Sequence, residues 1–341
     1  MGSTIRWLVC AALLAALAVG LGMLSAKVEL NHRAEKRTFA IASEMLASGA
    51  WGVPTLEGRP RLQKPPLYYW CAAGAAWIAG TPSVLALRAV SVFAGLALVV
   101  LVFAWGHSLG GFAPGLASAL ALVAMGQFWW SATHATADML LVSFTTAALF
   151  AFERRNLPLL ALLLVFAFLT KATAALLDVG VPIAVWLTVD RSLRIALRPR
   201  VLAWSAAAAV ACLGWYAGVL VFVPGAPALL REFFFVPLGA GHSDLASDHY
   251  RSVLWYLPRF LGAAAPAIVL LPFVIRAGAR THFWGNAPRV RFIAAGALAL
   301  FVAWSLIPQK GRHYLLPILP LFALLCGELR IRVRGESPMR G

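Results

Sequence analysis

The chain has 341 residues, of which 61% are hydrophobic and only 12% are charged, a composition that excludes an ordinary soluble domain. The net charge of +16 raises the question of nucleic-acid binding, but the basic residues flank apolar runs instead of forming one patch, which argues against that function. The composition indicates an integral membrane protein, because many windows of about 20 apolar residues can cross a hydrocarbon core of about 30 Å.

The first apolar run begins after Arg6 and continues to about Met23. We interpret it as an uncleaved span with a cytoplasmic N-terminus, because it is long and no small-residue cleavage site precedes Lys27. Ten further apolar runs follow along the chain. They lie at about 67–80, 86–106, 111–130, 138–152, 157–175, 176–189, 201–222, 252–275, 291–307 and 314–327. This pattern predicts an all-α, polytopic helical bundle that forms one membrane domain over residues 1–341.

The stretch 27–66 separates the first two apolar runs and is neither continuously apolar nor uniformly basic. Residues 33–48 have helical periodicity with one apolar stripe, and Gly49 is expected to end this helix. The stripe contains Phe39, Ile41, Ala42, Met45 and Leu46. We expect an amphipathic helix that lies in the outer membrane interface. Further on, Lys64-Pro65-Pro66 holds a cation on an extended backbone just before an aromatic run, which suits the phosphate of a lipid.

Arginine-rich segments predict the orientation in the membrane. They contain Arg154 and Arg155, then Arg191, Arg194, Arg198 and Arg200, then Arg276, Arg280, Arg289 and Arg291, and finally Arg330, Arg332, Arg334 and Arg340. The positive-inside rule places all four segments in the cytoplasm, and the loops 27–66 and 223–251 on the periplasmic side of the inner membrane. The run 67–80 is too short to span comfortably, so we interpret it as re-entrant or interfacial and count about ten spans.

On this topology the outer loops collect polar groups that orientation alone does not explain. They are Glu35, Arg37, Lys64, Asp138, Lys171, Lys310, Arg312 and His313. Basic residues on the less basic side favour a site for an anion. Each has a simpler alternative: Lys171 can snorkel to the interface, Asp138 can cap a helix, and Glu35 can be a solvated charge.

Two histidines and two aspartates, His242, Asp244, Asp248 and His249, occur together in the loop 223–251. Their spacing is compatible with a divalent ion, but also with a plain loop. We therefore assign no metal ligands and no cofactor, and a bound divalent metal ion stays an open alternative.

Five segments in the same order resemble the C-type, multi-spanning glycosyltransferases, which include bacterial aminoarabinose transferases acting on lipid A and protein O-mannosyltransferases. They read AEKRTFAIASEMLASGAWGVPTLEGRPRLQKPPLYYW, TADMLLVSFTTAALFAF, FLTKATAALL, HYRSVLWYLPRFL and SLIPQKGRHYLLPILPLFALL. The resemblance covers roughly residues 28 to 327. It implies a sugar donor on a polyprenyl phosphate and transfer at the outer membrane face.

The resemblance also implies roles for individual residues. Lys64, Lys171 and Arg37 would neutralise the carrier phosphate, Asp138 would share their cavity, and the segment with Lys310, Arg312 and His313 would close it. The chain departs from the family at Ala34-Glu35, where an Asp-Glu pair is usual, and at Gln63, where an acidic residue commonly precedes Lys-Pro-Pro. Without that Asp, Glu35 or Asp138 is expected to be the catalytic base.

The sequence thus predicts an inner-membrane glycosyltransferase that moves a sugar from polyprenyl phosphate to a lipid, polysaccharide or protein acceptor of the envelope. Two alternatives stay open. A transporter or flippase for a polyprenyl-linked sugar is one, although no inverted repeat is visible in the sequence. A non-catalytic subunit of a glycosylation complex is the other, suggested by Ala34.

Overall fold

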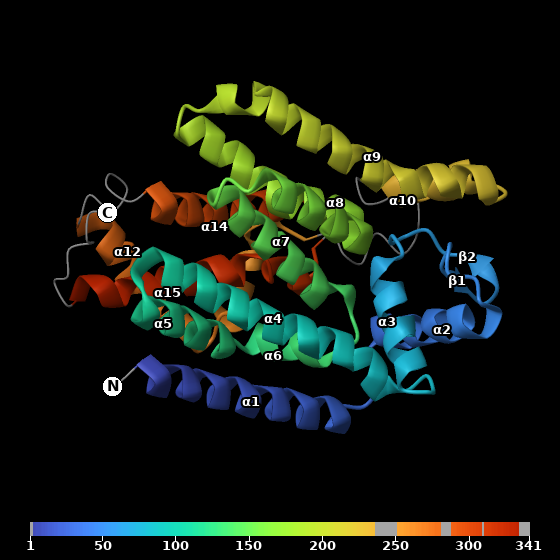
Figure 1. Ribbon diagram of the computed structural model, residues 1–341, viewed down its shortest axis with the longest axis horizontal. Coiled ribbons are helices and arrows are strands. Elements are labelled where there is room, and N and C mark those ends of the chain that lie inside the picture. Colours follow the sequence, from blue (N-terminus) through green and yellow to red (C-terminus); the bar gives the residue numbers. More distant parts are fainter. Residues whose placement is uncertain (1–2, 236–250, 281–287, 309, 334–341) are drawn as a thin grey trace.

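The computed structural model describes residues 3–235, 251–280, 288–308 and 310–333, and nearly all of them are helical (Figure 1). The strands in these ranges are the antiparallel pair β1 (Thr55–Leu56) and β2 (Arg59–Pro60). Most of the long helices run side by side along the longest axis of the molecule (Figure 1). The predicted all-α class is confirmed.

The helices have the following bounds. They are α1 (Ser3–Lys27), α2 (Arg33–Ser48), α3 (Leu67–Ile78), α4 (Val84–Gly110), α5 (Phe112–Val123), α6 (Gly126–Thr133), α7 (Ala137–Glu153), α8 (Leu157–Val189), η1 (Leu193–Leu197), α9 (Pro199–Phe222), α10 (Ala226–Phe235), η4 (Val253–Trp255), α11 (Tyr256–Ala263), η5 (Ala267–Leu270), α12 (Leu271–Arg280), α14 (Pro288–Leu306), η6 (Arg312–Leu315) and α15 (Ile318–Val333).

Contacts between distant parts of the chain define two ends of the bundle. At one end, which we call the site end, Glu35 of α2 accepts hydrogen bonds from Arg88 of α4 and from the backbone N–H of Ala135, just before α7. At the other end, which we call the arginine end, Arg289 of α14 bonds Glu153 of α7 and Ser108 of α4. Helices α4 and α7 therefore both run from the site end to the arginine end.

Helix α8 reverses direction at Lys171, whose backbone is non-helical (φ −160°, ψ 80°). Its first half forms a hairpin with α7 and returns to the site end, where Lys171 meets Asp138. Its second half packs against α14 in antiparallel order. The contacting pairs are Asp178 with Trp304, Pro182 with Gly296 and Trp186 with Phe292. The second half therefore returns to the arginine end, and the predicted runs 157–175 and 176–189 are separate passes through the bundle.

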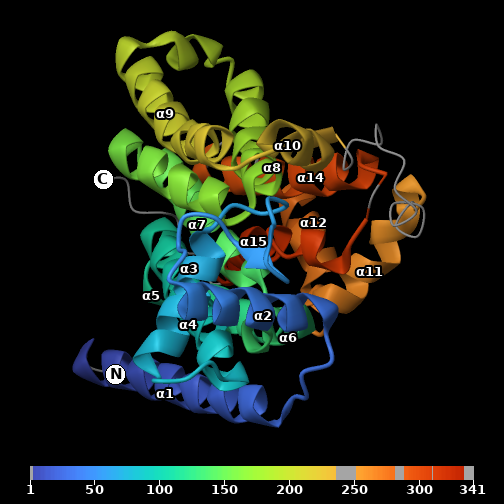
Figure 2. The same ribbon diagram turned by 90° about the vertical axis from the view of Figure 1, so that its right-hand side faces the viewer.

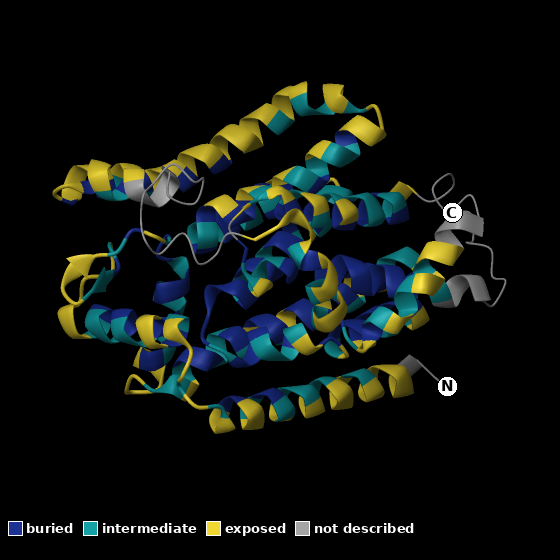
Figure 3. Cartoon of the chain, turned by 180° about the vertical axis from the view of Figure 1, so that it is seen from behind, coloured by how far each residue is buried: buried dark blue, intermediate teal, exposed yellow. Residues whose placement is uncertain are grey.

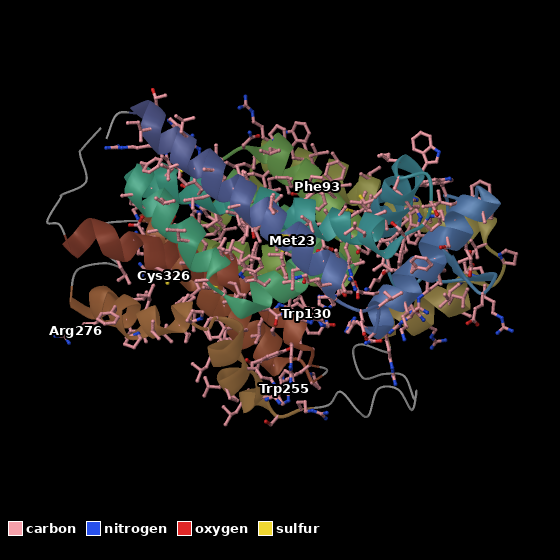
Figure 4. All side chains as sticks on the ribbon, turned by 90° about the horizontal axis from the view of Figure 1, so that it is seen from below. Met23, Phe93, Trp130, Trp255, Arg276 and Cys326 are labelled. Carbon is pink, nitrogen blue, oxygen red and sulfur yellow. The ribbon has the colours of Figure 1, made fainter. Side chains whose placement is uncertain are left out.

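Three of the arginine-rich segments gather away from the site end, as the predicted orientation requires. The turn at Arg154 and Arg155 follows Glu153 directly. The C-terminal half of α9 reaches the first loop, where Trp215 bonds the carbonyl of Gly52, so the N-terminus of α9 with its arginines lies at the other end. Figure 4 shows Arg276 at the end of the molecule where α1 begins, which is also the arginine end.

Six of the described helices are long and apolar enough to cross a membrane, or eight spans if the bent pairs α5–α6 and α11–α12 each form one. Many side chains on the outer faces of α1 and α9 are apolar and exposed, as expected for surfaces that lipid covers (Figure 3). Counting α7 and the two halves of α8 separately would bring the number to ten, which remains a prediction.

The predicted amphipathic helix exists with the expected bounds as α2. Gly49 ends it in a left-handed conformation (φ 68°) that favours glycine, and its N–H bonds the carbonyl of Met45. Helices α2 and α3 lie next to each other (Figure 2). Ile41 and Met45 of the apolar stripe are buried in one cluster with Tyr68 of α3. The apolar stripe is thus covered by protein, and the place of this helix in the membrane interface stays a prediction.

Candidate active site at the end of the bundle

An ion pair between Asp138 and Lys171 lies at the centre of the site end. The first turn of α7 carries Asp138, and its Oδ1 accepts a hydrogen bond of 3.0 Å from the Lys171 ammonium. The break in α8 turns Lys171 toward this carboxylate, and its Nζ also lies 4.7 Å from the ring centre of Tyr314. Both charged side chains are largely buried, with 12% and 15% exposure, so their interaction is less screened than a surface pair.

Lys64 and His313 complete this cluster. Lys64, fixed by the two following prolines, interacts electrostatically with Lys171 and Asp138. Burial lowers the pKa of Lys64 to about 8, and the nearby Lys171 charge contributes to this shift. The ring of His313 lies 4.2 Å from that of Tyr314, tilted by 56°, and His313 also acts electrostatically on Asp138. At neutral pH two ammonium groups thus face one carboxylate, which leaves a net positive charge for an anionic ligand.

A buried aromatic stack supports the cluster from inside the bundle. The indole of Trp304 lies parallel to the ring of Tyr314 at 4.2 Å, and its Nε1 donates to Oδ1 of Asp178 at 2.9 Å. Asp178 is 1% exposed, and its Oδ2 has no partner in the described part of the chain. Our sequence reasoning missed Asp178, although an aspartate within an apolar run is itself a signal of function.

Glu35 has a different place from the one expected of a catalytic base. It is fully buried, and Arg88 donates to both of its oxygens at 2.9 and 2.8 Å. The N–H of Ala135 donates a third bond of 2.6 Å. Burial alone would raise the pKa of Glu35, but these hydrogen bonds outweigh it and the pKa lies below the ordinary value.

Arg88 extends this clamp to α1, because its Nη1 donates to the carbonyl oxygens of Ser25 and Val28. The pair therefore joins the end of α1, α2, α4 and the loop before α7, and leaves no oxygen of Glu35 free to meet a substrate. This geometry argues against Glu35 as the base, an assignment that stays a prediction. Arg88 was missed in the sequence, where it stands out as a charge within an apolar run.

Lys310 also has a structural place and not the expected ligand contact. It is buried, and its ammonium donates to the carbonyl oxygens of Ser305 and Ile307 at 2.5 and 2.7 Å. It thereby satisfies carbonyl groups that the end of α14 leaves without helical partners. Arg312 is exposed at the start of η6. Of the predicted late motif, His313 is the residue that reaches the Asp138–Lys171 pair.

Arg37 lies at the rim of the cluster. Its Nε donates to the carbonyl of Arg33 at 3.3 Å, and burial together with the charge of Arg61 lowers its pKa. Lys64 also experiences the charges of Arg37 and Arg61. The short β1–β2 hairpin that precedes Arg61 is held against α2 by Glu44, which accepts hydrogen bonds from Thr55 and the N–H of Glu57. Positive charge therefore continues from the buried cluster to the outer surface of the first loop.

No protein-family model matches this chain. It is 27% identical over 317 residues to an undecaprenyl phosphate-alpha-4-amino-4-deoxy-L-arabinose arabinosyl transferase of Edwardsiella ictaluri, covering 89% of this chain and 56% of that protein. A transferase of the same name from Sodalis glossinidius is 29% identical over 321 residues, covering 85% and 53%. The chain spans about half the length of the curated relatives it matches.

Solved structures with a similar fold include a protein of the same kind. ArnT from Cupriavidus metallidurans bound to undecaprenyl phosphate superposes with a TM-score of 0.81 at 22% identity, over 96% of this chain and 60% of that one. This chain has the C-type glycosyltransferase fold. An oligosaccharyltransferase of Archaeoglobus fulgidus, tethered with an acceptor peptide, is a more distant neighbour, with a TM-score of 0.57 at 12% identity over 94% and 50%. The predicted resemblance is confirmed.

The expected ion site belongs to the loop 223–251. Residues 236–250 of the loop 223–251, with the four His and Asp residues of the expected ion site, lie outside the described residues. Within the described ranges, no group of three or more His, Cys, Asp or Glu side chains is arranged to hold a metal ion. The divalent metal therefore stays an open prediction.

Proposed function

We propose that this chain is a membrane glycosyltransferase that takes a sugar from a polyprenyl phosphate and adds it to a lipid, polysaccharide or protein acceptor. The buried cluster of Lys64, Asp138 and Lys171 is the observation that carries the proposal. It lies at the end of the bundle opposite the arginine-rich segments, which by the positive-inside rule is the periplasmic side of the inner membrane. The solved relative with the same fold holds undecaprenyl phosphate.

The chemistry of the cluster fits a lipid phosphate as leaving group. When the bond between the sugar and the phosphate breaks, negative charge develops on the phosphate oxygens. The ammonium groups of Lys64 and Lys171 stabilise this charge in a water-poor site, where such interactions are strong. Asp138 holds the Lys171 ammonium by a hydrogen bond, and the ring face of Tyr314 packs against the same ammonium. None of these steps requires a protein nucleophile.

For the sugar, we propose a pentosyl donor of the aminoarabinose type as the first to be tested. The support is the activity by which the two relatives are named, which are 27% and 29% identical to this chain over the aligned residues. Residues of the site cluster contact the phosphate in this scheme and do not discriminate among sugars.

The test is a transfer assay with the purified protein in lipid nanodiscs. Radiolabelled undecaprenyl-phosphate aminoarabinose and hexosyl-phosphate lipids are offered as donors, and an envelope lipid and polysaccharide extract as acceptor. The parent protein should transfer label. Lys171→Met keeps the aliphatic chain, removes the charge and should abolish transfer, whereas Lys36→Met, on the exposed face of α2, should not.

Two results would contradict the proposal. Equal transfer by the parent and Lys171→Met would exclude the cluster as the site. No transfer from any donor, combined with movement of the labelled donor across proteoliposome membranes, would favour the transporter alternative.

A further inference from the structure

We propose that His134 is the general base that takes the proton from the acceptor, and that the Glu35–Arg88 pair positions it. This inference rests on the proposed glycosyl transfer and adds the residue that activates the acceptor. It concerns the loop between α6 and α7, which lies immediately before Asp138.

The first argument is that four carboxylates of the site end are already engaged. Glu35 accepts three hydrogen bonds and is fully buried, Asp138 is paired with Lys171, and Glu44 fastens the β1–β2 hairpin. Glu29 accepts a bond of 2.7 Å from Asn31 at the end of α1. Each of these carboxylates would have to give up a native partner to bind an acceptor hydroxyl.

The second argument is the orientation of the His134 ring. Its Nδ1 lies 2.7 Å from the carbonyl oxygen of Trp130, which can only accept, so Nδ1 carries the proton in the neutral ring. Nε2 then has the free lone pair, and it has no hydrogen-bond partner among the described residues. The ring stacks on the indole of Trp130 at 4.5 Å and 19°, which fixes its plane. A donor bond at one nitrogen that leaves the other as acceptor is the arrangement a histidine base needs.

The third argument is that the scaffold holds the loop that carries this ring. The next residue, Ala135, donates its N–H to the buried Glu35, and Thr136 donates to the carbonyl of His134. Arg88 fixes Glu35 in turn through two bonds. The ion pair therefore sets the position of the base and acts as a positioning pair.

The charged groups around His134 suit a ring that becomes cationic in the reaction. From the start of α2 come His32, whose ring centre lies 6.3 Å away, and Glu35. Asp138 of α7 and His313 of η6 interact electrostatically with His32. Burial and the neighbouring His134 lower the pKa of His32, so His32 is neutral and adds no repulsive charge at neutral pH. The carboxylate of Glu35 interacts electrostatically with His134 and stabilises the imidazolium.

The step balances as follows. Nε2 takes the proton of the acceptor hydroxyl, and the acceptor oxygen forms a bond to the anomeric carbon of the sugar. The bond from that carbon to the phosphate oxygen breaks, and its electron pair stays on the phosphate, near Lys64 and Lys171. The imidazolium then releases its proton to water.

His134→Asn is the decisive variant, because its side-chain amide keeps a donor for the Trp130 carbonyl but removes the basic nitrogen. Transfer from undecaprenyl-phosphate aminoarabinose to a hydroxyl acceptor and binding of the donor are both measured. We expect an unchanged donor Kd and a transfer rate lower by about a hundredfold or more. His107→Asn at the arginine end is the control and should match the parent.

The proposal is overturned if His134→Asn transfers sugar at the parent rate, while Lys171→Met remains inactive. In that case the glycosyltransferase function stands and the base assignment fails. Absence of transfer by the parent protein overturns both. Should His134→Asn fail to bind donor, the same measurements on His134→Gln decide by the same criteria.

Discussion

Substitution of Arg88 by methionine tests whether Glu35 belongs to the scaffold. In the parent, Arg88 donates two bonds to Glu35, and both side chains are at most 1% exposed. Arg88 also donates to the carbonyl groups of Ser25, Val28 and Glu29. Arg88→Met leaves the Glu35 charge buried without its counter-ion. Removal of one partner of a buried ion pair costs about 3 to 5 kcal/mol, and we expect a loss of this size in the free energy of unfolding.

The assay is reversible unfolding in mixed detergent micelles, followed by tryptophan fluorescence. The single variants Arg88→Met and Glu35→Gln and the double variant form a double-mutant cycle. The double variant should be more stable than Arg88→Met, because no buried charge remains unpaired, with a coupling energy of about 2 to 3 kcal/mol. If Arg88→Met costs less than about 1 kcal/mol, the reasoning is refuted. A Glu35→Gln variant with parental stability but no transfer would restore Glu35 as the catalytic residue.

Other predictions concern the lysines and the orientation. Lys64→Ala and Lys171→Ala should each weaken binding of undecaprenyl phosphate by about 1.5 to 3 kcal/mol, roughly ten- to a hundredfold, as measured by lipid titration. Donor affinity should fall as the pH rises through about 8, because Lys64 is cationic below that pKa and neutral above it, and this limb should vanish in Lys64→Met. Lys310→Met should lower the melting temperature but leave donor affinity unchanged, because the Lys310 ammonium of the parent donates to carbonyl groups at the end of α14. A loss of donor affinity at parental stability would instead support a ligand-binding role for Lys310. Cysteines placed at positions 154 and 63 should differ in labelling by an impermeant thiol reagent on intact cells, with 63 reactive and 154 protected; the reverse pattern would contradict the orientation.

Local features of the chain carry the parts of the fold that the sequence predicts well. The helix 33–48 follows from its apolar period and from the glycine that ends it, both of which act within a few residues. The rigid Lys64-Pro65-Pro66 step and the arginine-rich turns are likewise local. Burial of apolar segments in a membrane depends mainly on their composition, so an all-α bundle could be predicted before any contact was known.

The predicted site residues divide according to their distant partners. Lys64, Asp138, Lys171 and His313 do meet, as expected from their common side of the membrane. Lys310 lies on that same side, but its ammonium donates to the free carbonyl groups at the end of the preceding helix, α14. Membrane side limits where a charged group can lie, and it does not select the partner.

The sequence by itself determined that this chain crosses a membrane many times and that a cationic site lies opposite its arginine-rich segments. Only the tertiary structure decided which charges belong to that site. Glu35 and Arg88 are 53 positions apart and Asp178 and Trp304 are 126 apart, so no periodicity connects them. A buried charge pairs with whichever opposite or polar group the packed helices bring within reach, because leaving it unpaired costs several kcal/mol. Here the packed helices pair Glu35 with Arg88, and the neighbouring His134 keeps a nitrogen without a partner among the described residues.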